Sequence, residues 1–120
     1  MAGLTLRRTR SNPGIRALTA EVRLSPQQFI QPHFVVEGLE EREPVPGLTD
    51  VFRETSDSLL AQVDADLKAG ANKLLLFGVP QHKTNQDFEF DFTARQVANL
   101  RDRFGDDLWI AVDVCLCSYT

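Results

Sequence analysis

Apolar and polar positions alternate with two different periods along the chain. Residues 29–36 are mostly apolar, and they predict a β-strand that becomes regular after Pro32, because proline cannot donate a ladder hydrogen bond. The runs 73–77 and 108–114 are almost continuously apolar, as expected of parallel strands covered on both faces. Between these strands apolar residues recur at helical spacing. The order strand, helix, strand, helix, strand predicts an α/β fold with parallel pairing.

Capping residues set the expected limits of the two helices. The first is expected to have Ser56 as its N-cap and to stop at Gly70, and the second to run from the cap Thr93 to a break at Gly105. The segment 39–55 is polar and contains two prolines and a charge run. We therefore predict a solvated loop between the first strand and the first helix.

Repeated strand–helix units form either an open doubly wound sheet or a (β/α)₈ barrel, and in both the chemistry gathers at the carboxyl ends of the strands. Asp113 is the one acid within the last apolar strand, and burying it is costly unless it is paired or hydrogen-bonded. It is therefore the first candidate site residue. No glycine-rich phosphate loop follows the first strand, which argues against a nucleotide-binding open sheet.

The only two cysteines, Cys115 and Cys117, are separated by one residue. A disulfide between such near neighbours is geometrically poor, so a reducing cytoplasm is the simpler setting. Two interpretations stay open: small residues completing a buried strand, or two thiolate metal ligands on one face of it. A tetrahedral zinc site needs three or four ligands, so a small two-thiol metal carrier is a weaker alternative. His33 is expected to be a hydrogen-bonded structural histidine.

Charge is distributed unevenly around a net value of −4, which argues against a general nucleic-acid binder. Residues 1–23 carry five arginines and one acid, whereas the rest of the chain is acidic. This basic arm could dock on an acidic protein surface, bind nucleic acid or a membrane surface, or remain solvated. No apolar run approaches the roughly 20 residues of a membrane span, and no apolar region typical of a secretory signal follows the arginines.

The ending Asp113–Thr120 resembles the metal-binding segment of the porphobilinogen synthase (5-aminolaevulinate dehydratase) family. Other blocks resemble the family's arm, first strand, following loop and second strand, in that order: Arg7–Arg10 with Ile15-Arg16 and Glu21–Pro26, Phe34–Gly38, Arg42–Gly47, and Leu76–Pro80. The resemblance implies a partial TIM (β/α)₈ barrel, with a basic N-terminal arm over 1–28 and the first three barrel strands within 29–120. It also implies condensation of two 5-aminolaevulinate molecules to porphobilinogen in tetrapyrrole and haem synthesis.

The resemblance also implies roles for individual residues. Cys115 and Cys117 match the first two of three zinc-binding cysteines, and Asp113 matches an active-site acid. The third cysteine and the two catalytic lysines, one forming a Schiff base, lie beyond Thr120 in the family pattern. Ser118 departs from the family, which usually has proline there. The arm matches one that embraces a neighbouring subunit, so a homo-oligomer is expected.

Two hypotheses follow. A complete barrel takes about 250 residues, so the chain could be the N-terminal part of a zinc-type synthase, inactive and only marginally stable by itself. Alternatively, it could be a short non-catalytic paralogue that binds or regulates the full-length enzyme. The retained cysteines favour the first hypothesis, because the second does not account for them.

Overall fold

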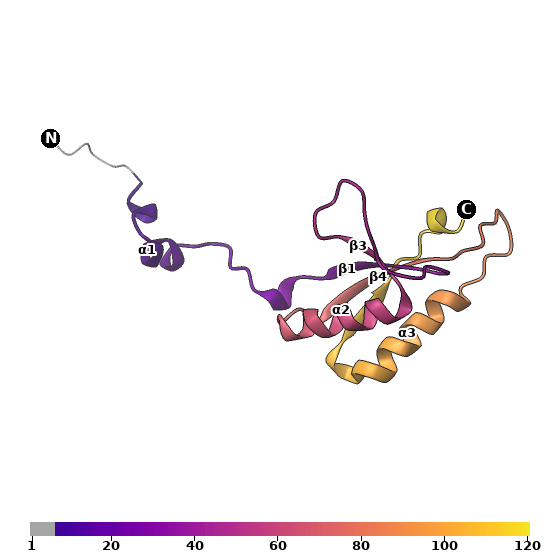
Figure 1. Ribbon diagram of the computed structural model, residues 1–120. Coiled ribbons are helices and arrows are strands. Elements are labelled where there is room, and N and C mark those ends of the chain that lie inside the picture. Colours follow the sequence, from indigo (N-terminus) through magenta and orange to yellow (C-terminus); the bar gives the residue numbers. More distant parts are fainter. Residues whose placement is uncertain (1–6) are drawn as a thin grey trace.

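One five-stranded sheet organises the computed structural model, which describes residues 7–120. The strands are β1 (Gln31–Val36), β2 (Glu43–Pro44), β3 (Phe52–Glu54), β4 (Lys73–Val79) and β5 (Trp109–Val112). The α-helices are α1 (Pro13–Leu18), α2 (Ser56–Lys68) and α3 (Asp91–Phe104). Short 3₁₀ turns cover Arg8–Arg10, Pro26–Gln28, Gly105–Asp107 and Leu116–Ser118. The sheet order is β2-β3-β1-β4-β5, and α2 and α3 lie together on one side of it (Figure 1).

Parallel pairing of the three main strands is confirmed. β4 pairs in parallel with β1 on one side and with β5 on the other. The solvated loop expected over 39–55 is wrong in part, because β2 and β3 lie within it and pair antiparallel. β3 then pairs in parallel with β1 at Phe34 and Val35. These strands of two and three residues are too short to give an alternating apolar pattern, so backbone pairing alone reveals them.

Several strand limits differ from the prediction. β1 is regular from Gln31, before Pro32, and it pairs with β4 along its whole length. Pro32 is tolerated because the β3 ladder reaches only Phe34 and Val35 on the other side of β1. β4 continues to Val79, two residues beyond the apolar run 73–77, and β5 ends at Val112, two residues before the end of the run 108–114.

The core lies between the sheet and the two helices. Alternate residues of β1 and β4 are buried there against residues of α2, α3 and the chain before β5: Val35, Leu59, Val63, Leu74, Leu76, Phe92, Leu100 and Leu108. The expectation that these strands are covered on both faces is wrong for residues 7–120. The intervening residues of β4 are only half-buried, and on that open face Phe34 stacks on Phe77 with ring centroids 5.0 Å apart.

Both predicted helix stops are confirmed, and both predicted N-caps are wrong. Gly70 and Gly105 have positive φ at the ends of α2 and α3, where glycine is favoured. Thr55, one residue earlier than predicted, caps α2 and exchanges side-chain-to-backbone hydrogen bonds with Ser58. Thr93 lies inside α3, buried, where its hydroxyl has a different partner, described below.

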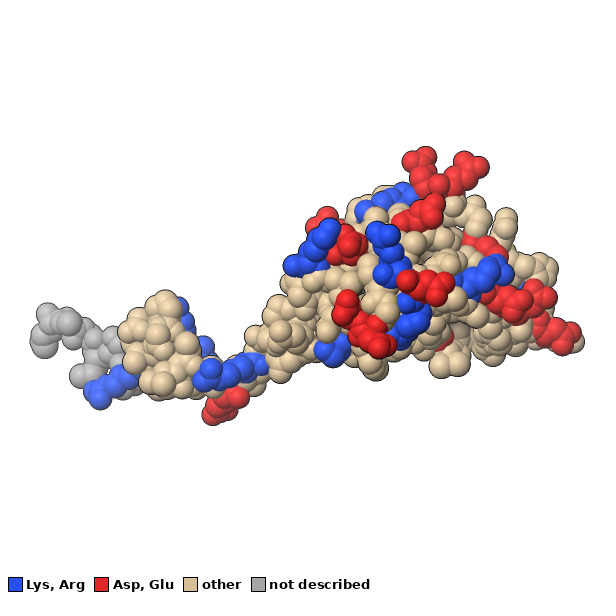
Figure 2. Space-filling model, turned by 90° about the horizontal axis from the view of Figure 1, so that it is seen from below, with Lys and Arg blue, Asp and Glu red and all other residues tan. Residues whose placement is uncertain are grey.

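Residues 7–30 extend away from the sheet (Figure 1). None of their side chains is buried. α1 is capped by Asn12, whose side chain accepts from the Ile15 amide at 3.0 Å. Basic groups outnumber the one acid, Glu21, along this segment, whereas many groups of both signs of charge cover the body (Figure 2). The division into an arm over 1–28 and a barrel part over 29–120 stays a prediction.

Within residues 7–120, no helix combines the length and apolar character that crossing a bilayer demands.

Candidate functional site: a two-thiol turn at the carboxyl end of the sheet

The candidate site residues Asp113, Cys115 and Cys117 follow β5 at the carboxyl end of the parallel strands. The amide of Asp113 still donates to the Leu76 carbonyl at 2.9 Å, so the ladder with β4 extends one residue past β5. The chain then leaves the sheet and forms the 3₁₀ turn Leu116–Ser118. The idea that the cysteines complete a buried strand is therefore wrong, as is the idea that strand alternation aligns them.

Asp113 points away from the helices. Val112 is in register with Leu76, which is buried on the helix side of the sheet, so strand alternation directs Asp113 to the opposite, open face. Its side chain is half-buried, and no residue between 7 and 120 pairs with its carboxylate by a hydrogen bond or a salt bridge. The cost of burying an acid is avoided by partial exposure, and the carboxylate is available at the rim of the open face.

Turn geometry brings the two thiols together. The amide of Cys117 donates to Cys115 Sγ at 3.4 Å, and both cysteines are free and exposed. A separate hydrogen bond between the two cysteine side chains raises the pKa of the Cys117 thiol. The negative charge of Asp113 adds to the rise. A bound cation would oppose this rise, because it stabilises the thiolate forms and displaces the thiol protons.

Two sulfur donors in one turn suit a thiolate-binding ion such as Zn²⁺, and so far they fit the predicted metal site. Residues 7–120 contain no group of three histidine, cysteine, aspartate or glutamate side chains placed to hold a metal. A metal site here would require at least one further ligand from elsewhere, because the turn could supply only two.

Contacts between the residues after the cysteines and the body hold the turn in place. Ser118 Oγ donates to the Gly78 carbonyl at 3.0 Å, a bond that a proline at this position could not make. Lys83 Nζ donates to the Ser118 carbonyl, and the Thr84 amide donates to the Tyr119 carbonyl at 2.9 Å. No local sequence pattern indicates these roles, because each contact joins residues 35 to 40 positions apart.

All three lysine ammonium groups of the chain are engaged. Lys68 contacts Asp64 at 2.5 Å, Lys73 donates to the Gln27 carbonyl at 2.6 Å, and Lys83 donates to the Ser118 carbonyl. A Schiff-base amine must be free to become neutral and attack a carbonyl. None of the three has an arrangement of that kind.

An open cavity of about 610 Å³ lies beside the turn, under the segment 80–90. Its wall includes Tyr119 and the ion pair of Glu37 with Arg95, whose atoms lie 3.3 Å apart. The other oxygen of Glu37 accepts from the Gln81 amide at 3.1 Å, so the carboxylate is already satisfied on both sides. This cavity presents no unpaired buried group that would mark a ligand site.

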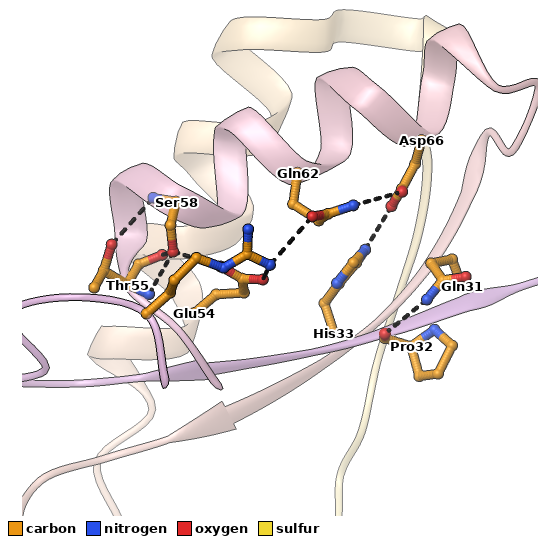
Figure 3. A network of polar contacts seen from close by, with 9 residues as sticks. Gln31, Pro32, His33, Glu54, Thr55, Ser58, Gln62 and Asp66 are labelled. Carbon is orange, nitrogen blue, oxygen red and sulfur yellow. Dashed lines mark hydrogen bonds and ion pairs between the residues drawn. The ribbon is translucent and has the colours of Figure 1, made fainter. Parts of the chain in front are cut away.

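The structural interpretation of His33 is confirmed (Figure 3). Its Nε2 lies 2.6 Å from Asp66 Oδ2, and Gln62 donates to the other oxygen of Asp66 at 3.0 Å. The network continues through Arg42 to Glu54, a carboxylate only 1% exposed that also accepts from Ser58. It joins β1, the β2–β3 segment and α2 on the helix side of the sheet, away from the thiols.

Comparison with known proteins decides the family. The family model described as delta-aminolevulinic acid dehydratase matches residues 4–120. This chain belongs to the delta-aminolevulinic acid dehydratase family. Its relatives of that name include one from Bacillus subtilis, 33% identical over 95% of this chain, and one from Streptomyces coelicolor, 34% identical over 98%. The chain spans 36% and 38% of the lengths of those two dehydratases.

A solved dehydratase also has the same fold. The porphobilinogen synthase of Toxoplasma gondii ME49, in complex with the reaction product porphobilinogen, superposes with a TM-score of 0.78 at 24% identity. The alignment covers 98% of this chain and 35% of that one. The family predicted from the sequence is thus confirmed, and so is a mixed α/β sheet with helices similar to that of a porphobilinogen synthase.

Proposed function

We propose that this chain forms the first part of a porphobilinogen synthase, the enzyme that condenses two molecules of 5-aminolaevulinate to porphobilinogen and releases two waters. The observation that carries the proposal is the family match over 4–120, which ends on a two-thiol turn at the carboxyl end of a parallel sheet. Active-site residues gather at this end of strands in parallel α/β folds, and above all in barrels.

The proposed architecture is the start of a (β/α)₈ barrel. β1, β4 and β5 are its first three strands, and α2 and α3 are the helices that follow the first two. Support comes from the one-sided burial of the sheet: the helix side is packed, whereas the side carrying Phe34, Phe77 and Asp113 is open. In a barrel that open side faces the interior, so Asp113 would reach the mouth of the barrel.

Each site residue has a proposed task. Cys115 and Cys117 would hold Zn²⁺ together with a third cysteine from a segment outside residues 1–120. Bound there with an open position, zinc supplies Lewis-acid polarisation of a substrate carbonyl or of its bound water. Asp113, an unpaired carboxylate on the open face, would attract and orient the ammonium group of 5-aminolaevulinate and accept a proton from it.

The amine chemistry is proposed to come from elsewhere. The three lysines of this chain contact a carboxylate or carbonyl oxygens, and none of them matches the positions that the resemblance gives to the catalytic lysines. We expect no porphobilinogen above background when the purified 120-residue chain is incubated with 5-aminolaevulinate and Zn²⁺. Turnover by the chain alone would contradict this part of the proposal.

The arm is proposed to join subunits in a homo-oligomer. Leu18, Val22 and Leu24 are each about three-quarters exposed, and arginines flank them. Apolar side chains presented in this way lose unfavourable hydration when they are covered by a partner. Deleting residues 1–28 should lower the oligomeric state measured by light scattering.

Two free thiols also fit a reducing compartment such as the cytoplasm.

A chimera tests the function. Residues 1–120 would be joined to the part of the Bacillus subtilis relative that follows its matched segment, and porphobilinogen formation would be measured. The proposal predicts a chimera that folds and forms porphobilinogen. A folded chimera without turnover, alongside an active Bacillus subtilis control, would contradict the proposal.

A further inference from the structure

The segment that carries the two thiols is exposed at its centre and buried at its end. Val114 is 86% exposed and both cysteines are exposed, whereas Tyr119 is only 5% exposed. The exposed segment Val114–Cys117 has few contacts of its own to fix its conformation. Its geometry must therefore be set where it is anchored, and the strongest anchor is Tyr119.

Tyr119 is held by a buried hydrogen bond and by two rings. Its hydroxyl lies 2.9 Å from Thr93 Oγ1 in the first turn of α3, and both residues are buried. Phe90 and Phe88 pack around the tyrosine ring, with centroids 5.1 and 6.4 Å away. The ring therefore cannot turn without breaking a buried hydrogen bond and displacing aromatic packing.

The anchor is connected to the thiols through the backbone of the turn. The Tyr119 amide donates to the Leu116 carbonyl at 2.9 Å and closes the 3₁₀ turn, while the Cys117 amide donates to Cys115 Sγ. Both bonds belong to the same short turn. A displacement of Tyr119 would therefore change where the Cys117 thiol lies relative to the Cys115 thiol.

We infer that Tyr119, fixed by Thr93, is the positioning residue for the Cys115–Cys117 pair. The inference deepens the proposed function and rests on it as far as the bound metal is concerned. It assigns to α3 a task beyond covering the sheet, because the Thr93 hydroxyl holds the residue that shapes the thiol turn. Partners that orient a ligand are worth about 10–100-fold in metal affinity, and an indirect partner belongs at the lower end of that range.

The test compares two variants of one residue. Thr93→Val keeps the shape of the side chain and removes the hydroxyl, whereas Thr93→Ser keeps the hydroxyl and removes a methyl group. Cd²⁺ would be titrated into the 120-residue chain, and the thiolate-to-metal charge-transfer absorption would report binding. We expect Thr93→Val and Tyr119→Phe to weaken Cd²⁺ binding about tenfold, and Thr93→Ser to bind Cd²⁺ like the parent chain.

Val63→Ala is the control for a loss of general stability. Val63 lies in the core on α2, away from the turn, so this variant lowers stability by removing buried methyl groups without touching the anchor. It should bind Cd²⁺ like the parent chain. If Val63→Ala weakened Cd²⁺ binding as much as Thr93→Val does, the effect would be one of stability and the inference would be overturned.

A metal-free measurement separates this inference from the proposed metal site. The hydrogen-exchange rates of the Cys117 and Tyr119 amides should rise in Thr93→Val and stay unchanged in Thr93→Ser. If the parent chain bound no Cd²⁺, two thiols without a further ligand would be too few to hold the ion, and the exchange rates alone would decide the positioning role. Equal exchange rates in the parent and Thr93→Val would overturn the inference whether or not metal binds.

Discussion

The hydroxyl of Thr93 occupies the space that a Cβ at residue 78 would need. A side chain built on Gly78 would overlap the Thr93 hydroxyl and crowd its Cβ and methyl group, and the Gly78 φ angle is not one that favours glycine. Glycine is therefore required at this point of β4 by close packing against α3. The absence of one side chain allows the Thr93 hydroxyl to reach Tyr119.

Replacing Gly78 by alanine tests this relationship. Gly78→Ala should lower the free energy of unfolding by about 1–3 kcal/mol, the usual cost of overpacking a core, as measured by urea denaturation. Adding Thr93→Ala should relieve part of the overlap, so the double variant should be less destabilised than the two single variants predict together. Unchanged stability in Gly78→Ala would mean that the two residues are not in contact.

The partly buried pair of His33 and Asp66 should contribute to stability. Asp66→Asn removes the charge that His33 and Gln62 both contact, and it should cost about 1–3 kcal/mol, as for other partly unsatisfied buried groups. Asp64→Asn is the matched control on the same helix, because Asp64 pairs only with the exposed Lys68. We expect little change there. Equal urea midpoints for the two variants would contradict this account.

Arg42 is expected to matter more than its exposed position indicates. Arg42→Met would leave the Glu54 carboxylate, 1% exposed, without its cationic partner, 2.9 Å away, and we expect a loss of about 2–4 kcal/mol. Adding Glu54→Gln should restore part of it, because no charge is then left buried alone. Arg53→Met, which removes an exposed contact of 3.9 Å, serves as the control in the same thermal-denaturation series.

The charge of Asp113 should slow the alkylation of Cys117 in the metal-free chain. Hydrogen bonding to Cys115 raises the pKa of Cys117 and the Asp113 carboxylate raises it further, so Asp113→Asn should lower that pKa. At a given pH below the pKa, a lower value means more thiolate and faster alkylation. Iodoacetamide labelling followed by mass spectrometry measures the rate at Cys117. Asp106→Asn is the control, and a slower rate in Asp113→Asn would reverse the sign of this argument.

The sequence predicted the elements whose apolar patterns are long enough to be recognised. β1, β4, β5, α2 and α3 all lie near their expected places, because burial against a common core imposes a period on each. β2 and β3 were missed because strands of two or three residues bury too little to leave a period in the sequence. The N-cap of α2 was misplaced by one residue because Thr55 and Ser56 are both good caps.

The sequence predicts the residue types of the candidate site but not the contacts that hold them in place. The spacing of Cys115 and Cys117 indicated a thiol pair, yet a 3₁₀ turn brings them together and not a strand. The sequence predicts Thr93 as a helix cap because hydroxyl residues are common there, whereas the packing of α3 on β4 turns it toward Tyr119. Contacts between distant segments of this kind leave no local signal in the sequence.

The most direct test of the account is the rate of porphobilinogen formation by the chimera with the Bacillus subtilis relative when Cys115→Ser and Cys117→Ser are introduced together. The account predicts that the rate falls to background, that bound zinc is lost, and that the folded fraction is unchanged. A serine chimera that kept the parent rate would contradict the claim that this turn is the metal-holding part of a porphobilinogen synthase site.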